Sequence, residues 1–113
     1  MKTTEQGRRA EAAVAKYLIG RGFKILAQNW RRPRCEVDII TIKKSIIYFV
    51  EVKYRGSGSQ GDGFEYVTPK KQNQVEFAAR VWAQENKWSG DYRLMAAAVG
   101  GDDCARIDLI ELS

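Results

Sequence analysis

The sequence predicts a single α/β domain, in which helices flank a mixed central sheet of about five strands. Segments with helical and with strand-like hydrophobic spacing alternate in the order αβββαββ. The second helical segment stands between strands, where it can cross over to a parallel neighbour. The 113 residues suffice for one core, and the chain has no repeat or linker, so we expect one domain over residues 1–113.

The first helix is expected over residues 4–21, with Thr4 as its N-cap and Gly22 as its C-terminal stop. Glu11 lies at the edge of the apolar stripe of this helix, so we expect its carboxylate to face inward. The stripe is formed by Ala10, Ala13, Val14, Tyr17 and Leu18.

Three strand-like runs follow, over residues 23–30, 36–43 and 46–55. The last two are rich in β-branched and aromatic residues, and only Lys44-Ser45 separates them, which predicts a two-residue hairpin. In that register Lys43 would face Ile46, Asp38 would face Glu51, Val37 would face Val52 and Glu36 would face Lys53. A slip by one residue would mix apolar and charged side chains on both faces.

The remaining segments complete the sheet. Residues 55–64 are a Gly/Ser-rich loop without the Lys-Ser/Thr ending of a phosphate-cradling loop. Thr68-Pro69 predicts the start of a helix that runs to about residue 87. Two strands are expected over residues 92–99 and 105–112, with turn residues between them. The inward stripe of the second helix consists of Val75, Ala78, Ala79 and Trp82.

Composition excludes several classes of site. The chain has no histidine, which excludes Ser-His-Asp and Cys-His catalysis and imidazole-based metal sites. Cys35 and Cys104 are too few for a disulfide scaffold, and we expect both to be reduced. A metal would need mainly oxygen ligands, which favours Mg²⁺ or Mn²⁺. Without a membrane-length apolar run or a signal peptide, we expect a cytoplasmic protein with no membrane partner.

Charge favours a polyanionic partner. Nineteen Lys and Arg against fourteen Asp and Glu give a net charge of +5, which suits nucleic acid. The basic residues cluster in two places, ahead of Glu36 and at the start of the second helix. The candidate nucleic-acid-binding residues are Arg31, Arg32, Arg34, Lys70 and Lys71.

The predicted register gathers Glu36, Asp38, Glu51 and Lys53 at one end of an otherwise apolar hairpin. Two opposed carboxylates repel each other unless a cation lies between them, and a hard divalent ion would resolve the conflict. A neighbouring lysine can stabilise charge that develops on a phosphate. The pattern therefore favours metal-assisted phosphodiester hydrolysis. The alternative is that these are solvated charges on an edge strand.

These residues also resemble a known motif. Asp38 and, after twelve intervening residues, Glu51-x-Lys53 in FVEVK resemble the PD-(D/E)xK motif of restriction-endonuclease-like nucleases. GRRAEAAVAKYL from Gly7, EVDII from Glu36 and FVEVKYR from Phe49 extend the likeness to nearly the whole chain. The sequence resembles the YraN-like family of small bacterial proteins, relatives of archaeal Holliday-junction resolvases.

The resemblance implies a restriction-endonuclease-like fold and roles for individual residues. Asp38 and Glu51 would be metal ligands, Lys53 the catalytic lysine, and Glu11 the helix glutamate that joins the site. Lys71 would contact a DNA phosphate, and Glu36 would assist. Cys35 departs from the family pattern, which has glycine before Glu36, and so leaves the local backbone path open.

The leading hypothesis is therefore a Mg²⁺- or Mn²⁺-dependent DNA endonuclease, with branched or junction DNA among its substrates. The resemblance to resolvases also suggests a homodimer. One alternative is a non-catalytic nucleic-acid-binding module on the same fold. A second alternative is a protein–protein adaptor that uses Trp30 and Trp88, although such aromatic residues more often pack in the core.

Overall fold

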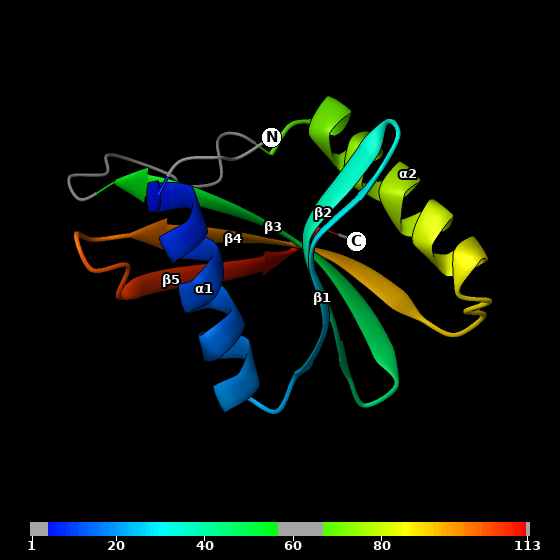
Figure 1. Cartoon of the computed structure of the whole chain (residues 1–113), viewed down its shortest axis with the longest axis horizontal. Helices are drawn as coiled ribbons and strands as arrows, with labels where there is room; N and C mark the ends of the chain where they lie inside the picture. The colour runs from blue at the N-terminus through cyan, green and yellow to red at the C-terminus, as the bar shows by residue number, and fades with distance from the viewer. Residues whose placement is uncertain (1–4, 57–66, 113) are drawn as a thin grey trace.

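A computed structural model describes residues 5–56 and 67–112. It confirms the predicted order αβββαββ, and each predicted bound holds to within two residues (Figure 1). The predicted N-cap Thr4 and most of the Gly/Ser-rich loop lie outside the described residues. The elements are α1 (Glu5–Gly20), β1 (Lys24–Arg32), β2 (Cys35–Lys43), β3 (Ile46–Gly56), α2 (Pro69–Glu85), β4 (Tyr92–Gly100) and β5 (Arg106–Glu111).

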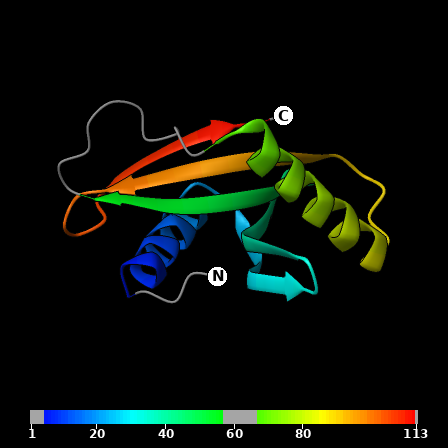
Figure 2. The same ribbon diagram turned by 90° about the horizontal axis from the view of Figure 1, so that it is seen from above.

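The five strands form one sheet in the order β1-β2-β3-β4-β5. Neighbouring strands are antiparallel except β3 and β4, which are parallel because α2 connects them as a crossover. Figures 1 and 2 show α1 on one face of the sheet and α2 on the other. Neither described helix is long and apolar enough to cross a membrane.

A separate hydrophobic cluster fills each face. Ala10, Val14 and Leu18 of α1 pack with Val50 and Val52 of β3 in the α1-side core. The α2-side core instead joins Phe49 and Ile40 to the helix stripe that the sequence predicts, Val75, Ala78, Ala79 and Trp82. Trp30 is buried in this second core and Trp88 is partly buried against it, so both pack with the core, as aromatic residues more often do.

The turns follow the backbone conformations that the sequence permits. Gly22 ends α1 with φ of +91°, and the Phe23 N–H donates to the carbonyl of Leu18. Lys44 and Ser45 both have positive φ, at 51° and 66°, as a two-residue hairpin with the right-handed strand twist requires. The predicted hairpin is confirmed, with pairing from Lys43↔Ile46 through Ile39↔Val50.

Beyond Ile39↔Val50 the two strands separate, and the rest of the predicted register is wrong. β2 stays with β1 in a two-stranded arm, residues 30–37, that turns toward α2, while β3 continues along β4 (Figures 1 and 2). Glu36 therefore pairs with Arg31 rather than Lys53. Val37 packs in the α2-side core with Trp30 rather than beside Val52. Burial of Trp30 and Val37 against α2 accounts for the departure of the arm.

The arm ends in a second tight turn, Pro33-Arg34. Cys35 is a regular strand residue that pairs with Arg32, so the backbone path there does not need glycine. The conformation that favours glycine falls instead on Arg34, whose φ is 97°. Cys35 and Cys104 are both free thiols, as expected.

Candidate functional site

Asp38 lies where β2 separates from β3, and its carboxylate accepts a hydrogen bond that the backbone of a paired strand would otherwise accept. Only 6% of the residue is exposed, and Oδ2 accepts a hydrogen bond of 2.7 Å from the N–H of Val52. In a continuous ladder that N–H would donate to the backbone of β2, and a buried N–H without a partner is costly. The hydrogen bond therefore holds the Asp38 carboxylate beside the peptide that joins Glu51 to Val52.

Glu51 points toward α2. Its neighbours Val50 and Val52 belong to the α1-side core, so alternation along the strand turns Glu51 to the other face. Its side chain is 13% exposed, and Oε2 lies 3.1 Å from Nζ of Lys71. Lys71 leaves the first turn of α2, which Thr68 fixes by accepting a hydrogen bond from the Lys71 N–H. The helix cap thus sets the position of the cation at Glu51.

The other two predicted catalytic residues, Lys53 and Glu11, lie on opposite faces of the sheet. Lys53 is exposed, and alternation along β3 puts it on the same face as Glu51. Glu11 is buried, at 4% exposure, as the sequence predicts. It belongs to α1, however, which covers the opposite face of the sheet from Glu51. In the described residues, Glu11 does not gather with Asp38 and Glu51 into a three-carboxylate metal site.

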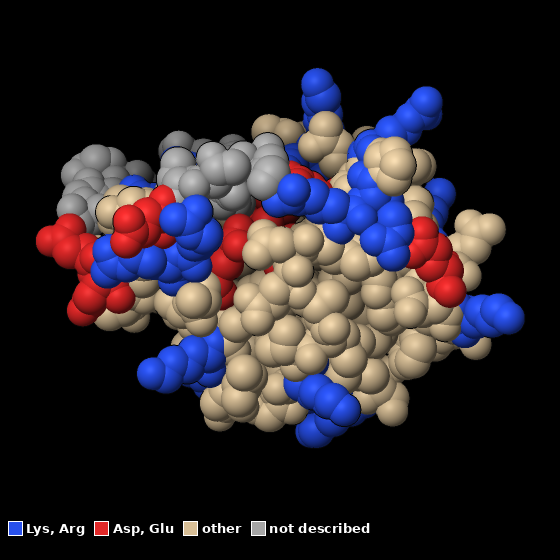
Figure 3. Space-filling view, in the orientation of Figure 1, with Lys and Arg blue, Asp and Glu red and all other residues tan. Residues whose placement is uncertain are grey.

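The five basic residues predicted to bind nucleic acid all line one pocket between the arm and α2. Its volume is about 820 Å³, within the range of ordinary ligand sites. Figure 3 shows basic side chains gathered over the arm and the start of α2, with acidic side chains beside them. The lining residues are Arg31, Arg32, Arg34, Cys35, Glu36, Lys70, Lys71, Asn73, Gln74, Val75 and Phe77.

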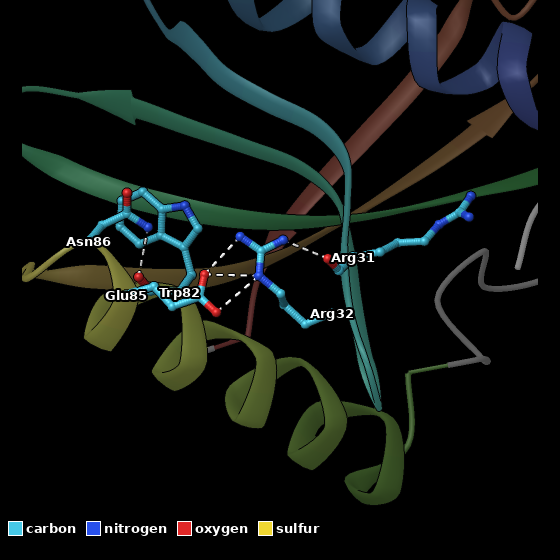
Figure 4. A network of polar contacts seen from close by, with 5 residues as sticks. All are labelled: Arg31, Arg32, Trp82, Glu85 and Asn86. Atoms are coloured by element: carbon cyan, nitrogen blue, oxygen red, sulfur yellow. Dashed lines mark hydrogen bonds and ion pairs between the residues drawn. The ribbon is translucent and has the colours of Figure 1, made fainter.

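Arg32 serves mainly to hold the arm against α2. Its Nε lies 2.9 Å from both carboxylate oxygens of Glu85 (Figure 4). Its guanidinium lies 4.7 Å from the ring centre of Trp30. The hydrogen bond to Glu85 raises the pKa of Arg32 above its usual value. Arg31 forms a looser ion pair with Glu36, at 3.7 Å. Arg32 is thus a less suitable phosphate ligand than its neighbours.

Besides Val75, which the sequence assigns to the inward stripe of α2, sequence reasoning missed four lining residues. Asn73, Gln74 and Phe77 share one face of α2 with Lys70, because residues three, four and seven positions apart lie on the same side of a helix. That spacing could have identified them. Cys35 is the fourth, and burial raises the pKa of its thiol, which favours the neutral form.

Comparison with known proteins identifies the family. The model of "Uncharacterised protein family UPF0102" matches residues 10–112. The chain belongs to this family, which is the YraN-like family that its motifs resemble. The UPF0102 protein of Sulfurihydrogenibium sp. is 33% identical over 109 residues, which cover 96% of this chain and 95% of that relative. A UPF0102 protein of Bradyrhizobium sp. is 38% identical over 93 residues, covering 82% and 67%.

Some UPF0102 relatives are longer than this chain. The UPF0102 protein of Chlorobium limicola is 45% identical over 76 residues, which cover 67% of this chain and 59% of the relative. The chain thus spans about three fifths of the length of that relative. The names of these relatives state no activity.

The carboxylates of this UPF0102 protein suit one mode of divalent metal binding. Within residues 5–56 and 67–112, no three Asp, Glu, Cys or His side chains gather as a metal site. Mg²⁺, however, is usually held by one or two carboxylates together with waters and substrate phosphates. Asp38 and Glu51, from adjacent strands, are hard oxygen donors of that kind. Because Lys71 contacts Glu51 in the structure, a metal at Glu51 would have to displace this lysine.

Proposed function

We propose that this protein is a metal-dependent endonuclease that hydrolyses phosphodiester bonds in DNA, branched and junction DNA included. One observation carries the proposal. Lys71 lines the pocket formed by the arm and α2 and also contacts Glu51, so one side chain links the basic pocket to a candidate metal ligand. A DNA strand bound in the pocket would present a phosphate to Lys71, Glu51 and Asp38.

The pocket supplies the binding energy. Arg31, Arg34 and Lys70 line it, and each phosphate that they neutralise releases counterions. The ion pair between Arg32 and Glu85 keeps the arm against α2 and so holds the two walls of the pocket together. Phosphate contacts of this kind position a strand without reading its sequence. The pocket therefore favours recognition of DNA shape over DNA sequence.

The carboxylates and lysines supply the chemistry. Asp38 and Glu51 would hold Mg²⁺ or Mn²⁺ together with water and a substrate phosphate, and the ion would supply a Lewis acid and lower the pKa of bound water. The Val52 N–H fixes the orientation of Asp38. Lys71, once displaced from Glu51, binds a phosphate oxygen. Lys53, exposed on the same face, stabilises the charge that develops on the phosphate.

A cleavage assay tests this function. The full chain is incubated with labelled four-way-junction, flap, duplex and single-stranded DNA, in Mg²⁺, in Mn²⁺ or in EDTA. We expect cleavage only with metal. Asp38→Asn and Lys53→Met should each lower the rate at least about 100-fold, the loss typical of a removed transition-state contact.

Two matched variants control for charge and fold. Asp91→Asn changes an exposed aspartate immediately before β4. Lys24→Met changes an exposed lysine at the start of β1. Both should keep the wild-type rate. Cleavage that persists in EDTA, or in Asp38→Asn, would contradict the proposal. Sedimentation equilibrium of the same samples, with and without junction DNA, tests the predicted homodimer.

One observation favours a second candidate function, a nucleic-acid-binding module that does not cleave. In the structure Lys71 already neutralises Glu51, which a catalytic metal would need. A module of this kind would bind the same DNA through the pocket in EDTA and would leave it intact in every metal tested. Binding of that kind, with unchanged affinity in Asp38→Asn, would select this candidate over the endonuclease.

A further inference from the structure

Phe77 is an exposed aromatic residue inside the cationic pocket. Its exposed fraction is 50%. Among the described residues, the other large hydrophobic side chains with comparable exposure are Ile19, Leu26 and Ile110, and none of these lines the pocket. Single exposed hydrophobic residues are common on protein surfaces. A phenylalanine among phosphate-binding cations is a more specific arrangement, because nucleic acids carry flat apolar bases beside their phosphates.

The α2 wall of the pocket combines three kinds of chemistry on one helix face. Lys70, Asn73, Gln74 and Phe77 share that face. A lysine binds phosphate, side-chain amides can donate to and accept from base edges, and an aromatic ring stacks on a base. These three kinds of group match the phosphate, the base edge and the base face of a single nucleotide.

The arm supplies the facing wall. Arg34 stands at its turn with φ of 97°, a conformation that suits glycine and strains other residues. The turn itself therefore does not account for an arginine at this position, whereas a phosphate contact does. In the part of the chain that the structure describes, no ion pair engages Arg34 or Lys70. Both cations can thus meet a ligand without first breaking an ion pair.

We infer that the pocket binds one unstacked nucleotide, with its base against Phe77 and its flanking phosphates on Lys70 and Arg34. Asn73 and Gln74 contact the edge of that base. A base inside a continuous duplex is stacked on both sides and cannot enter such a pocket without being flipped out. The protein therefore prefers DNA with unpaired bases, such as single strands, flaps and open junction centres. This inference rests on the proposed function, in that nucleic acid is the ligand.

Binding measurements in EDTA test the inference without cleavage. Fluorescence anisotropy gives the affinity of the full chain for a labelled single strand of about 16 nucleotides, for its duplex, and for that duplex with an unpaired bulge. Phe77→Leu removes the ring and keeps an apolar side chain. We expect about tenfold weaker binding of the single strand and the bulge, which corresponds to the lower part of the usual range for base stacking. Affinity for the duplex should not change.

The salt dependence separates stacking from charge. Phe77→Leu removes no charge, so the slope of log K against log[salt] should stay at the wild-type value. Lys70→Gln should reduce that slope by about 0.7 for the single strand, as expected for one lost phosphate contact. Phe77→Tyr, which keeps a ring, should bind as the wild type does. Ile19→Ala changes an exposed hydrophobic residue outside the pocket and serves as the matched control.

A direct readout of stacking completes the test. A 2-aminopurine base in the single strand should lose fluorescence on binding to the wild type and to Phe77→Tyr, and lose less with Phe77→Leu. Equal single-strand affinity in wild type and Phe77→Leu would overturn the inference. An equal loss of affinity for the duplex in Phe77→Leu would also overturn it. A change from dimer to monomer in Phe77→Leu at constant DNA affinity would overturn it as well, because it would assign the ring to contact with a second copy of the chain.

The outcome also distinguishes the inference from the proposed function. If the wild type cleaves DNA with metal while Phe77→Leu binds and cleaves every substrate normally, only the inference fails. If the wild type binds no nucleic acid at about 50 mM salt, where phosphate contacts are strongest, both fail.

Discussion

The two ends of the β2–β3 hairpin differ in strand pairing: the strands are hydrogen-bonded at one end and separate at the other. From the Lys44-Ser45 turn to Ile39↔Val50 the strands are paired. Phe49 in this stretch is fully buried, and its ring contacts those of Trp82 and Tyr92 edge-on, with centroids 5.6 and 5.5 Å apart. At the other end the strands separate, and the residues there are Asp38, Glu51 and Lys53. One end stabilises the domain, and the other holds the candidate metal ligands and the candidate catalytic lysine.

The difference follows from what each end can bury. Apolar side chains gain free energy when helices cover both faces of a paired sheet. Opposed carboxylates in the same ladder would repel each other. Separation of the strands leaves backbone groups of β3 without a strand partner, and Asp38 satisfies one of them through the Val52 N–H. Asp38 thus has a structural role as well as its proposed role as a metal ligand.

The largest effect should come from the paired end. Phe49→Ala deletes a fully buried ring that contacts Trp82 and Tyr92, so we expect a loss of about 3–5 kcal/mol in the free energy of unfolding. Urea unfolding followed by circular dichroism measures it. Phe77→Ala makes the same chemical change at a half-exposed position and should cost far less. Equal losses in the two variants would show that the paired end is not the stabilising one.

A smaller effect is expected at the separated end. Asp38→Ala removes the acceptor of the Val52 N–H and leaves a buried donor without a partner, which costs about 1–3 kcal/mol. Asp38→Asn keeps a side-chain oxygen at that place and should lose clearly less stability. Hydrogen exchange of the Val52 amide reports the bond directly, and should accelerate in Asp38→Ala only. Similar exchange in both variants would contradict the structural role of Asp38.

Much of the paired end could be predicted from the sequence, because alternating apolar residues and a two-residue turn fix the register locally. The separation could not. Val37 and Asp38 continue the same alternation, and what draws them away is the packing of Trp30 and Val37 against α2. The Arg32–Glu85 ion pair joins positions 53 residues apart, which no local pattern indicates.

The candidate site, too, could be predicted from the sequence only in part. Asp38, Glu51 and Lys53 stand out in the sequence because charges interrupt an apolar run. The cationic residues stand out as two clusters. Their common pocket does not, because it depends on where the arm lies relative to α2. Phe77 lies outside the inward stripe of its helix, and residue type alone gives no reason to assign it a ligand.

The smallest effect concerns pH, and it also belongs to the paired end. The hydroxyl of Tyr92 donates a hydrogen bond of 2.9 Å to Oε2 of Glu76, which also contacts Arg80. Burial, and then this hydrogen bond, raise the pKa of Tyr92 above its ordinary value of 10.0. The folded state therefore holds the phenolic proton more tightly than the unfolded state does. The contribution of the Tyr92 proton to the free energy of unfolding is fully present below pH 10, and it is lost as pH rises through the folded-state pKa of Tyr92.

Tyr92→Phe removes this contribution and isolates it. The variant should be less stable than the wild type at pH 7.5. The difference should shrink above about pH 10, because only the wild type carries the Tyr92 hydroxyl that loses its proton there. Urea unfolding at a series of pH values measures the difference. Tyr48→Phe, which removes a hydroxyl on the α1 side of the same hairpin, controls for the loss of a polar group. A difference between wild type and Tyr92→Phe that stays constant with pH would show that the Tyr92–Glu76 hydrogen bond does not hold the phenolic proton. Tyr92 would then stabilise the paired end only through its ring contact with Phe49.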